Sequence, residues 1–389
     1  MPGVGRPRNP AVDALMAAEG LSRDVARARM NRRLRKIRET RQYDAAGNLK
    51  ARSVVKAPLR LPHERMPNTV IARRSSLLDA ENNIIQQWVI EKPEDAQKRL
   101  AWEEAARILA EPLPRAEPIV EPLYRDDTLL VVYPIGDHHL GMLSWKTETG
   151  ADYDLEIGEQ LLVGAMRHLV KSAPPAADSL VVFLGDFLHY DSFDAVTPTN
   201  RNLLDADGRF PKMFDAGLRL MRRTIETAAA RHSKVHVIVE IGNHDPSSAI
   251  VLSRCLTAIY EAEPRISIDT SPRHFHYHEF GKVAIGVHHG HGRAAKAEHL
   301  PLIMAADRPD MWGRTRYRYW LTGHVHHQSV KDYAGCSVES FRILPPADAY
   351  AANEGYRAPR DMKAIMYHRE FGEVGRNTVN PQMLERKTT

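Results

Sequence analysis

Five apolar segments of strand length each end directly at a short polar segment, and this rhythm constrains the fold more than any other feature. The apolar segments are residues 129–135, 179–184, 235–241, 283–287 and 317–322. Helical patterns at about 155–172, 210–232 and 247–262 lie between several of them. Alternation of strand, loop and helix predicts an α/β sheet, in which ligands bind beyond the carboxyl ends of the strands. We therefore expect the polar segments to meet at one edge.

The polar segments share a composition of glycine, histidine, aspartate and asparagine. They read Gly-Asp-His-His-Leu-Gly at 136–141, Gly-Asp-Phe-Leu-His at 185–189, Gly-Asn-His-Asp at 242–245, His-His-Gly-His at 288–291 and Gly-His-Val-His-His at 323–327. Ten of the nineteen histidines fall in these windows, whereas structural histidines would be scattered. The clustering indicates a metal site.

A pair of divalent cations roughly 3.5–4 Å apart can clamp a phosphate and activate a bridging hydroxide for in-line attack. Such a pair needs a bridging carboxylate, further nitrogen and oxygen ligands, and an open side. Asp137 and His139 stand at i and i+2, so both can point the same way from an extended strand end. Asp186 is a natural bridge, and Asn243 offers a neutral amide oxygen. The remaining candidate ligands are His289, His324 and His326.

In this order the five segments resemble the signatures of calcineurin-like metallophosphoesterases, over about residues 128–346. The resemblance implies a β-sandwich of two mixed sheets flanked by helices. It also implies a catalytic role for His244, which would stabilise the transition state or protonate the leaving oxygen. The implied ligands are Asp137, His139, Asp186 and His326 for the first metal, and Asp186, Asn243, His289 and His324 for the second.

Details of the second segment favour one branch of that family. Gly-Asp-Phe-Leu-His-Tyr-Asp lacks the arginine that protein serine/threonine phosphatases carry there. His189 instead resembles the DNA-repair nucleases of the SbcD type, in which this histidine assists the catalytic one. Asp-His-His-Leu-Gly at 137–141 is similar both to those nucleases and to phosphoesterases encoded by phages. Because 136 residues precede the first motif and only about 60 follow the last, we expect no partner ATPase.

The N-terminal region is strongly basic. Residues 1–60 contain fifteen Lys/Arg and five Asp/Glu, which gives +10, while the whole chain carries +5. The patterns at 10–38 predict two helices and suit a small helix-turn-helix on DNA. A solvated basic tail is the alternative. We divide the chain into a basic nucleic-acid-binding region (1–60), a hairpin, helix and proline-rich linker region (61–125), the phosphoesterase domain (126–346) and a C-terminal extension (347–389). Turn residues at 43–48 and 78–83 predict β-hairpins.

Composition excludes several classes of protein. Only Cys255 and Cys336 are present, which excludes a disulfide framework or a thiolate zinc site. No apolar run approaches the roughly 18 residues that cross a bilayer, and the N-terminus lacks a secretory signal. We expect a cytoplasmic protein, with homo-oligomerisation left open.

The leading hypothesis is a two-metal-dependent phosphodiesterase that hydrolyses DNA, with Mn²⁺ as the expected metal and iron or zinc as alternatives. A phosphomonoesterase or small-nucleotide phosphodiesterase is the alternative enzyme, and a DNA-binding scaffold is the alternative of another class. We expect residues 190–212 to form one wall of the cleft, with hydroxyls such as that of Thr199, or Arg201 and Arg209, near phosphate; an ordinary surface insertion is the alternative. For His288 a role as a strand-end neighbour of the ligand is left open, and for His291 a role as a residue that supports the ligands. His138 and His327 are interpreted as spacers. His274, His276 and His278 share one strand face, interpreted as solvated rather than as an auxiliary metal site.

Overall fold

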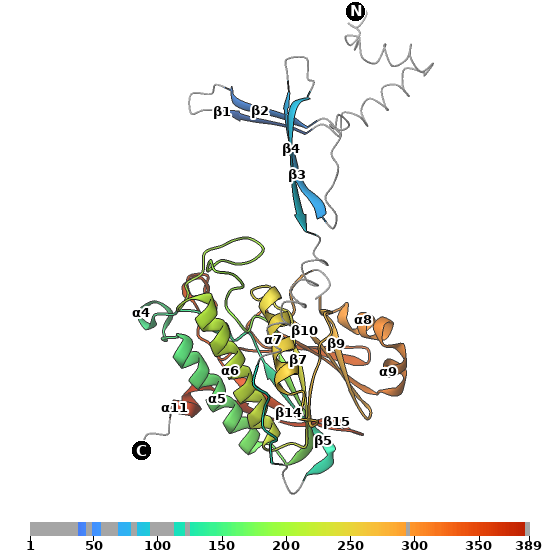
Figure 1. Ribbon diagram of the computed structural model, residues 1–389. Coiled ribbons are helices and arrows are strands. Elements are labelled where there is room, and N and C mark those ends of the chain that lie inside the picture. Colours follow the sequence, from blue (N-terminus) through green and yellow to red (C-terminus); the bar gives the residue numbers. More distant parts are fainter. Residues whose placement is uncertain are drawn as a thin grey trace, which may run out of the picture. The chain divides into compact units, whose positions relative to one another are not determined.

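The computed structural model describes residues 38–43, 49–55, 69–78, 84–93, 113–120, 125–292 and 296–385. The chain divides into two compact units, Met1–Lys98 and Arg99–Thr389. Each unit is described by itself, and Figure 1 labels its helices and strands.

The first unit contains two antiparallel hairpins. β1 (Arg38–Tyr43) pairs with β2 (Leu49–Val55), and β3 (Thr69–Leu78) pairs with β4 (Ile84–Pro93). Both predicted hairpins are confirmed, since the turn residues fall between the paired strands. The helices predicted over 10–38 lie, apart from Arg38, outside the described residues.

The second unit is built on two mixed sheets. The six-stranded sheet has the order β15 (Gly372–Val379), β14 (Met362–His368), β5 (Asp126–Ile135), β6 (Ala176–Phe183), β7 (Lys234–Val239) and β8 (Ile266–Ile268). The five-stranded sheet has the order β12 (Ser329–Tyr333), β13 (Cys336–Ser340), β11 (Tyr317–Thr322), β10 (Val283–His288) and β9 (His276–Phe280). The predicted α/β fold of two mixed sheets flanked by helices is confirmed.

The two sheets bury a shared apolar layer. Alternate residues of β5 point to opposite faces, so Leu130 and Val132 enter this layer while Tyr133 and Ile135 face the helices. Val283 and Ile285 of β10 meet them from the other sheet. Truncating such a buried leucine to alanine typically costs about 2–5 kcal/mol. Strands buried on both faces explain why the apolar runs read as nearly continuous in the sequence.

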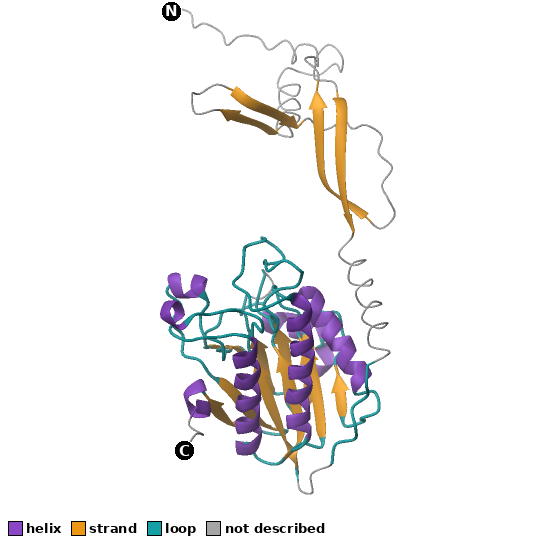
Figure 2. Cartoon of the chain, turned by 60° about the vertical axis from the view of Figure 1, so that its left-hand side comes forward, coloured by secondary structure: helices purple, strands orange, loops and turns teal. Residues whose placement is uncertain are grey.

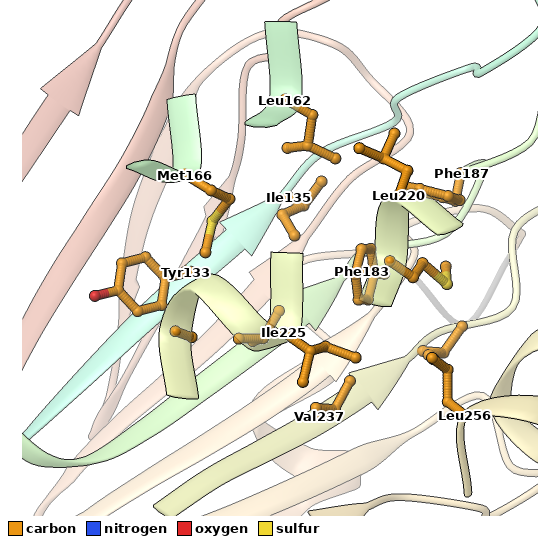
Figure 3. Packing of buried hydrophobic residues seen from close by; sticks show 14 of the residues in the cluster. Tyr133, Ile135, Leu162, Met166, Phe183, Phe187, Leu220, Ile225, Val237 and Leu256 are labelled. Atoms are coloured by element: carbon orange, nitrogen blue, oxygen red, sulfur yellow. The ribbon is translucent and has the colours of Figure 1, made fainter. Parts of the chain in front are cut away.

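Helices cover the outer faces of the sandwich. α5 (Leu155–Ser172) and α6 (Phe210–Ala229) run side by side over the six-stranded sheet, next to α7 (Pro246–Ile259) (Figure 1). Figure 3 shows Leu162, Met166 and Leu220 from these helices against Phe183 and other sheet residues. α8 (Leu300–Asp307) and α9 (Pro309–Arg314) pack on the five-stranded sheet around Trp320.

The sandwich continues beyond residue 346, where the sequence analysis ended it. β14 pairs antiparallel with β5, so the C-terminal segment supplies two strands of the central sheet. This pairing joins strands more than 200 residues apart and leaves no local signal in the sequence. The short helices α4 (Lys146–Thr149), α10 (Ala349–Asn353) and α11 (Pro381–Glu385) complete the unit.

The predicted strands that precede the motifs are confirmed as β5, β6, β7, β10 and β11. β5, β6 and β7 are mutually parallel, as are β10 and β11. In Figure 2 long loops gather at one end of the strands. Among the described residues, no helix has the length and apolarity needed to span a membrane.

Candidate metal centre

The carboxyl ends of five strands bring together the seven predicted ligands. Each ligand follows its strand within a few residues, so the sheet fixes the starting point of every loop. Their side chains come within reach of one another in two groups that each could hold an ion, with Asn243 beside the second, and His139 forms a third such group with His189 and His244.

The first group consists of Asp137, His139 and His326. The Asp137 side chain is fully buried, and its Oδ2 lies 3.0 Å from Nε2 of His326. Nε2 of His139 lies 3.3 Å from the same His326 nitrogen. The His324 backbone N–H donates to the Asp137 carboxylate at 3.0 Å, which ties the first motif to the last. This group has the composition that was predicted for the first metal, apart from Asp186.

The second group consists of Asp186, His289 and His324. Nε2 of His289 lies 3.2 Å from Oδ2 of Asp186 and 3.0 Å from Oδ1 of Asn243. Nδ1 of His289 donates to the Leu184 carbonyl at 2.7 Å, so Nε2 is left to face the centre. A backbone carbonyl that fixes the tautomer in this way is the usual support of a metal-binding histidine.

The two predicted catalytic histidines stand beside the first group. The rings of His189 and His244 are stacked with centroids 5.7 Å apart, and both lie next to His139. Nδ1 of His244 donates to the His189 carbonyl at 2.8 Å, so Nε2 is the nitrogen free for chemistry. The backbone N–H of His244 also donates to Oδ1 of Asp186 at 2.7 Å. His189 is buried, whereas His244 is only partly so.

Backbone strain concentrates at the centre. Among the described residues five that are not glycine have positive φ, and four of them are the candidate ligands His139, Asp186, His324 and His326, at φ between 44° and 70°. Such conformations are uncommon outside glycine and cost about 1–3 kcal/mol each. Strain repeated at four candidate ligands indicates that the loops are shaped for function rather than for stability.

Two glycines of the motifs are required by close approach. A Cβ on Gly242 would stand 2.1 Å from the Asp186 backbone nitrogen, and one on Gly323 would stand 2.4 Å from Oδ1 of Asp137. In both places a side chain would displace a candidate ligand, which explains the glycine that opens each motif.

The electrostatics favour positive charge. Burial opposes ionisation of Asp186, but His289 and its neighbours hold the pKa of this carboxyl well below its usual range. Burial also opposes charge on His289, yet Asp186 and Asp137 raise its pKa to about 10. The pKa of His139 is instead well below its ordinary value, because of burial and the surrounding histidines. The buried carboxylates of Asp137 and Asp186 therefore favour a positive charge in the centre, either a protonated imidazole or a bound cation.

The donor set fits divalent metal ions. Carboxylate, amide and imidazole donors converge without thiolate, a set that suits manganese, iron or zinc. Both ring nitrogens of His139 face other imidazole nitrogens, those of His326 and His189, at 3.3 Å each. The nitrogens of His139 and His326 would be available to an ion held with Asp137.

Sequence reasoning assigned no role to Asp245, which locks the second and third motifs together. It accepts from the backbone N–H groups of Asp186, Leu188 and Gly242 at 3.0–3.2 Å. Burial and the Asp186 charge raise its pKa to about 8. Asp191 similarly accepts from the N–H groups of Ser247 and Ser248 at the start of α7. The acidic residue directly after the histidine of Gly-Asn-His-Asp is the sequence signal that could have identified Asp245.

The centre opens into a cleft of about 1100 Å³. Thr199 and most of its neighbours between 197 and 205 line it, as predicted, whereas Arg201 and Arg209 do not. Arg201 pairs with Asp194 at the surface instead. A second part of the lining, which sequence reasoning missed, comes from residues between 343 and 358. Tyr350, Tyr356 and Arg357 belong to it.

The other motif histidines lie outside the two groups. His138 is buried with Nε2 3.1 Å from the Gly158 carbonyl, and His327 is exposed and lines the cleft. His288 stacks on Phe275, while His291 lies beside His289 with ring centroids 5.2 Å apart. The interpretation of a solvated face fails at His276, which is 2% exposed and faces two carboxylates.

Comparison with known proteins gives a likeness of fold. No family model matches the sequence. No curated protein matches it either. Among solved structures, the chain is similar to Vps29 of Entamoeba histolytica complexed with zinc, at 13% identity and a TM-score of 0.27, covering 64% of this chain and 98% of that one.

Two further solved structures show similar values. A predicted phosphoesterase of Streptococcus pneumoniae matches at 10% identity and a TM-score of 0.28, covering 64% of this chain and 97% of that one. The phosphopantetheinyl hydrolase of Mycobacterium tuberculosis matches at 11% and 0.25, covering 60% and 94%. At these scores the likeness supports no inference about activity, which must come from the geometry of the centre.

Proposed function

We propose that this chain is a two-metal-dependent phosphodiesterase of the calcineurin-like type that hydrolyses DNA. The proposal rests on one observation: two buried carboxylates and four histidines converge at the carboxyl ends of the strands, in a cleft open to solvent. They are Asp137, Asp186, His139, His289, His324 and His326. The order of the motifs along the chain supports the family, because each motif supplies the group that the resemblance assigns to it.

Each residue has a distinct task in this proposal. Asp137, His139 and His326 would hold one ion, and Asn243, His289 and His324 the other, with Asp186 between them. Bound divalent cations would neutralise and polarise the phosphoryl oxygens of the substrate. His244 presents Nε2 toward the cleft, because its Nδ1 is bound to the His189 carbonyl. When protonated, that nitrogen can donate a proton to the leaving oxygen. His189 holds His244 in place by stacking.

The walls of the cleft support a nucleic acid as substrate. Tyr350 and Tyr356 line it and are 66% and 62% exposed, so their rings are available to bases. Aromatic side chains beside a basic group are the usual surface for unpaired nucleotides. The +10 charge of residues 1–60 would add contacts to phosphate that weaken with salt.

The test is a direct comparison of substrates. Purified protein with Mn²⁺ is incubated with end-labelled single- and double-stranded DNA, p-nitrophenyl phosphate and its bis ester. We expect cleavage of DNA and of the bis ester, both lost in Asp186→Asn. His368→Gln is a matched control that should keep full activity, because His368 lies on β14, away from the motifs.

The same assay separates the alternative. Preference for the monoester or for free nucleotides, with DNA left intact, would keep the metal centre and refute the nuclease. No hydrolysis by a metal-loaded protein that still binds DNA would instead favour a DNA-binding scaffold.

A further inference from the structure

A second polar cluster lies behind the metal centre. Glu240 directly follows β7, His276 begins β9, and His274 precedes that strand by two residues. The Glu240 side chain is fully buried and His276 almost so, whereas His274 is 43% exposed. Two segments, one from each sheet, thus place one carboxylate and two imidazoles together.

The cluster holds buried polar atoms that lack an aligned partner. Among the described residues ten buried side-chain nitrogen and oxygen atoms make no hydrogen bond of normal geometry. Five of them belong to this neighbourhood: both Glu240 oxygens, Nδ1 of His274, Nε2 of His276 and Nδ1 of His291. The two Glu240 oxygens face imidazole nitrogens of His276 and His274, at 3.1 and 3.8 Å, without the alignment of a hydrogen bond. A cation bound among these atoms would satisfy the carboxylate and both imidazoles.

His276 is oriented as a metal-binding histidine would be. Its Nδ1 donates to Asp269 at 2.8 Å, which turns Nε2 toward Glu240 at 3.1 Å. A carboxylate behind one ring nitrogen is the common support for a histidine that binds metal through the other. The 3.1 Å separation matches those of His326 with Asp137 and His289 with Asp186, at 3.0 and 3.2 Å.

We infer that Glu240, His274 and His276 bind a third divalent cation, separate from the two at the strand edge. Two imidazoles and a carboxylate with one open position form a donor set suited to Zn²⁺. Nδ1 of His274 lies 3.8 Å from Glu240. The three atoms do not form a group as tight as those of the main centre, so the half-exposed His274 must turn inward on binding.

The ion would support the main centre from behind. The His291 ring lies between the two sites, with its centroid 5.8 Å from that of His274 and 5.2 Å from that of His289. By joining β7 to the start of β9, the cation would brace the strand that leads into the third motif.

The test counts and locates metal in the full-length chain. Protein stripped with chelator and reloaded with Zn²⁺ is analysed by elemental mass spectrometry, and crystals are measured at the zinc absorption edge. We expect three equivalents in the wild type and an anomalous peak between Glu240 and His276. His274→Ala and Glu240→Gln should each hold two equivalents, with both peaks of the main centre retained.

Controls make the outcome decisive. His278→Ala, on the same strand but stacked on His236, should keep three equivalents. Asp186→Asn should lose metal from the main centre while the third peak remains. A wild-type crystal with no peak beside Glu240, or a third equivalent unaffected by His274→Ala and Glu240→Gln, would overturn the inference. Failure of the proposed phosphodiesterase activity would leave it standing, because the readout is metal content.

Discussion

His232 and His139 are both buried histidines, but they lie in different surroundings. Nε2 of His232 meets the Tyr133 hydroxyl and its Nδ1 meets the Ala176 carbonyl, each at 2.8 Å. The nitrogens of His139 meet imidazole nitrogens of His326 and His189, each at 3.3 Å. His139 also has φ of 44°. The structural histidine has hydroxyl and carbonyl partners, whereas the candidate ligand has a strained backbone and ring nitrogens that face the imidazoles of a second candidate ligand and a candidate catalytic residue.

The largest expected effect comes from exchanging these two histidines for asparagine. His139→Asn should lower phosphodiesterase activity by about 10³-fold, because the charge stabilisation of the transition state depends on an intact centre. His232→Asn should leave the rate at pH 7 unchanged but lower the free energy of unfolding. Steady-state kinetics and urea denaturation of both variants measure this. Equal loss of activity in the two variants would contradict the distinction between a metal-binding His139 and a structural His232.

A pH dependence of stability should follow from His232. Burial lowers its pKa to about 4, and the nearby Arg231 charge adds to this. In the unfolded chain His232 is protonated below about pH 6.5, whereas in the folded chain it stays neutral down to about pH 4. The contribution of neutral His232 to the free energy of unfolding is therefore fully present above pH 6.5 and is lost as the pH falls toward 4. The loss amounts to about 3 kcal/mol. Denaturation of wild type and His232→Gln between pH 4 and 7 should converge as pH falls. If the free energies of unfolding of the two proteins instead differed by the same amount at every pH, His232 would not titrate in this range.

His244→Gln should sharpen the division between ligand and catalyst. His244 forms a third candidate group with His139 and His189, but it lies outside the groups that contain Asp137 and Asp186, so the metal content of those two groups should stay unchanged. The value of kcat should fall by about 10²-fold through loss of the proton donor. Elemental analysis accompanies the kinetics. Loss of both metals in this variant would show that His244 is itself a ligand.

The smallest effect is expected at the cleft wall. Tyr356→Ala should raise KM for single-stranded DNA by about 10-fold, which corresponds to the loss of one stacked base. Hydrolysis of bis-p-nitrophenyl phosphate should change little. Tyr333→Ala, on β12 outside the cleft lining, is the control. An equal change for both substrates would argue against base stacking.

The strand ends and their motifs were predictable because they are local. An apolar run followed by glycine and aspartate predicts where β5 and β6 end and where Asp137 and Asp186 emerge. The wall at 343–358 and the pairing of β14 with β5 were not predictable, since both depend on long-range packing. Glu240 carried no signal either, because its partners His274 and His276 come from a distant strand.

Metal reconstitution tests the central claim most directly. Full-length protein is stripped with chelator, titrated with Mn²⁺ and assayed on bis-p-nitrophenyl phosphate, beside Asp186→Asn with circular dichroism as a check of folding. The account predicts an inactive stripped protein whose activity returns with Mn²⁺, and a folded variant that stays inactive at every concentration. Hydrolysis by the stripped protein, or full recovery in Asp186→Asn, would contradict it.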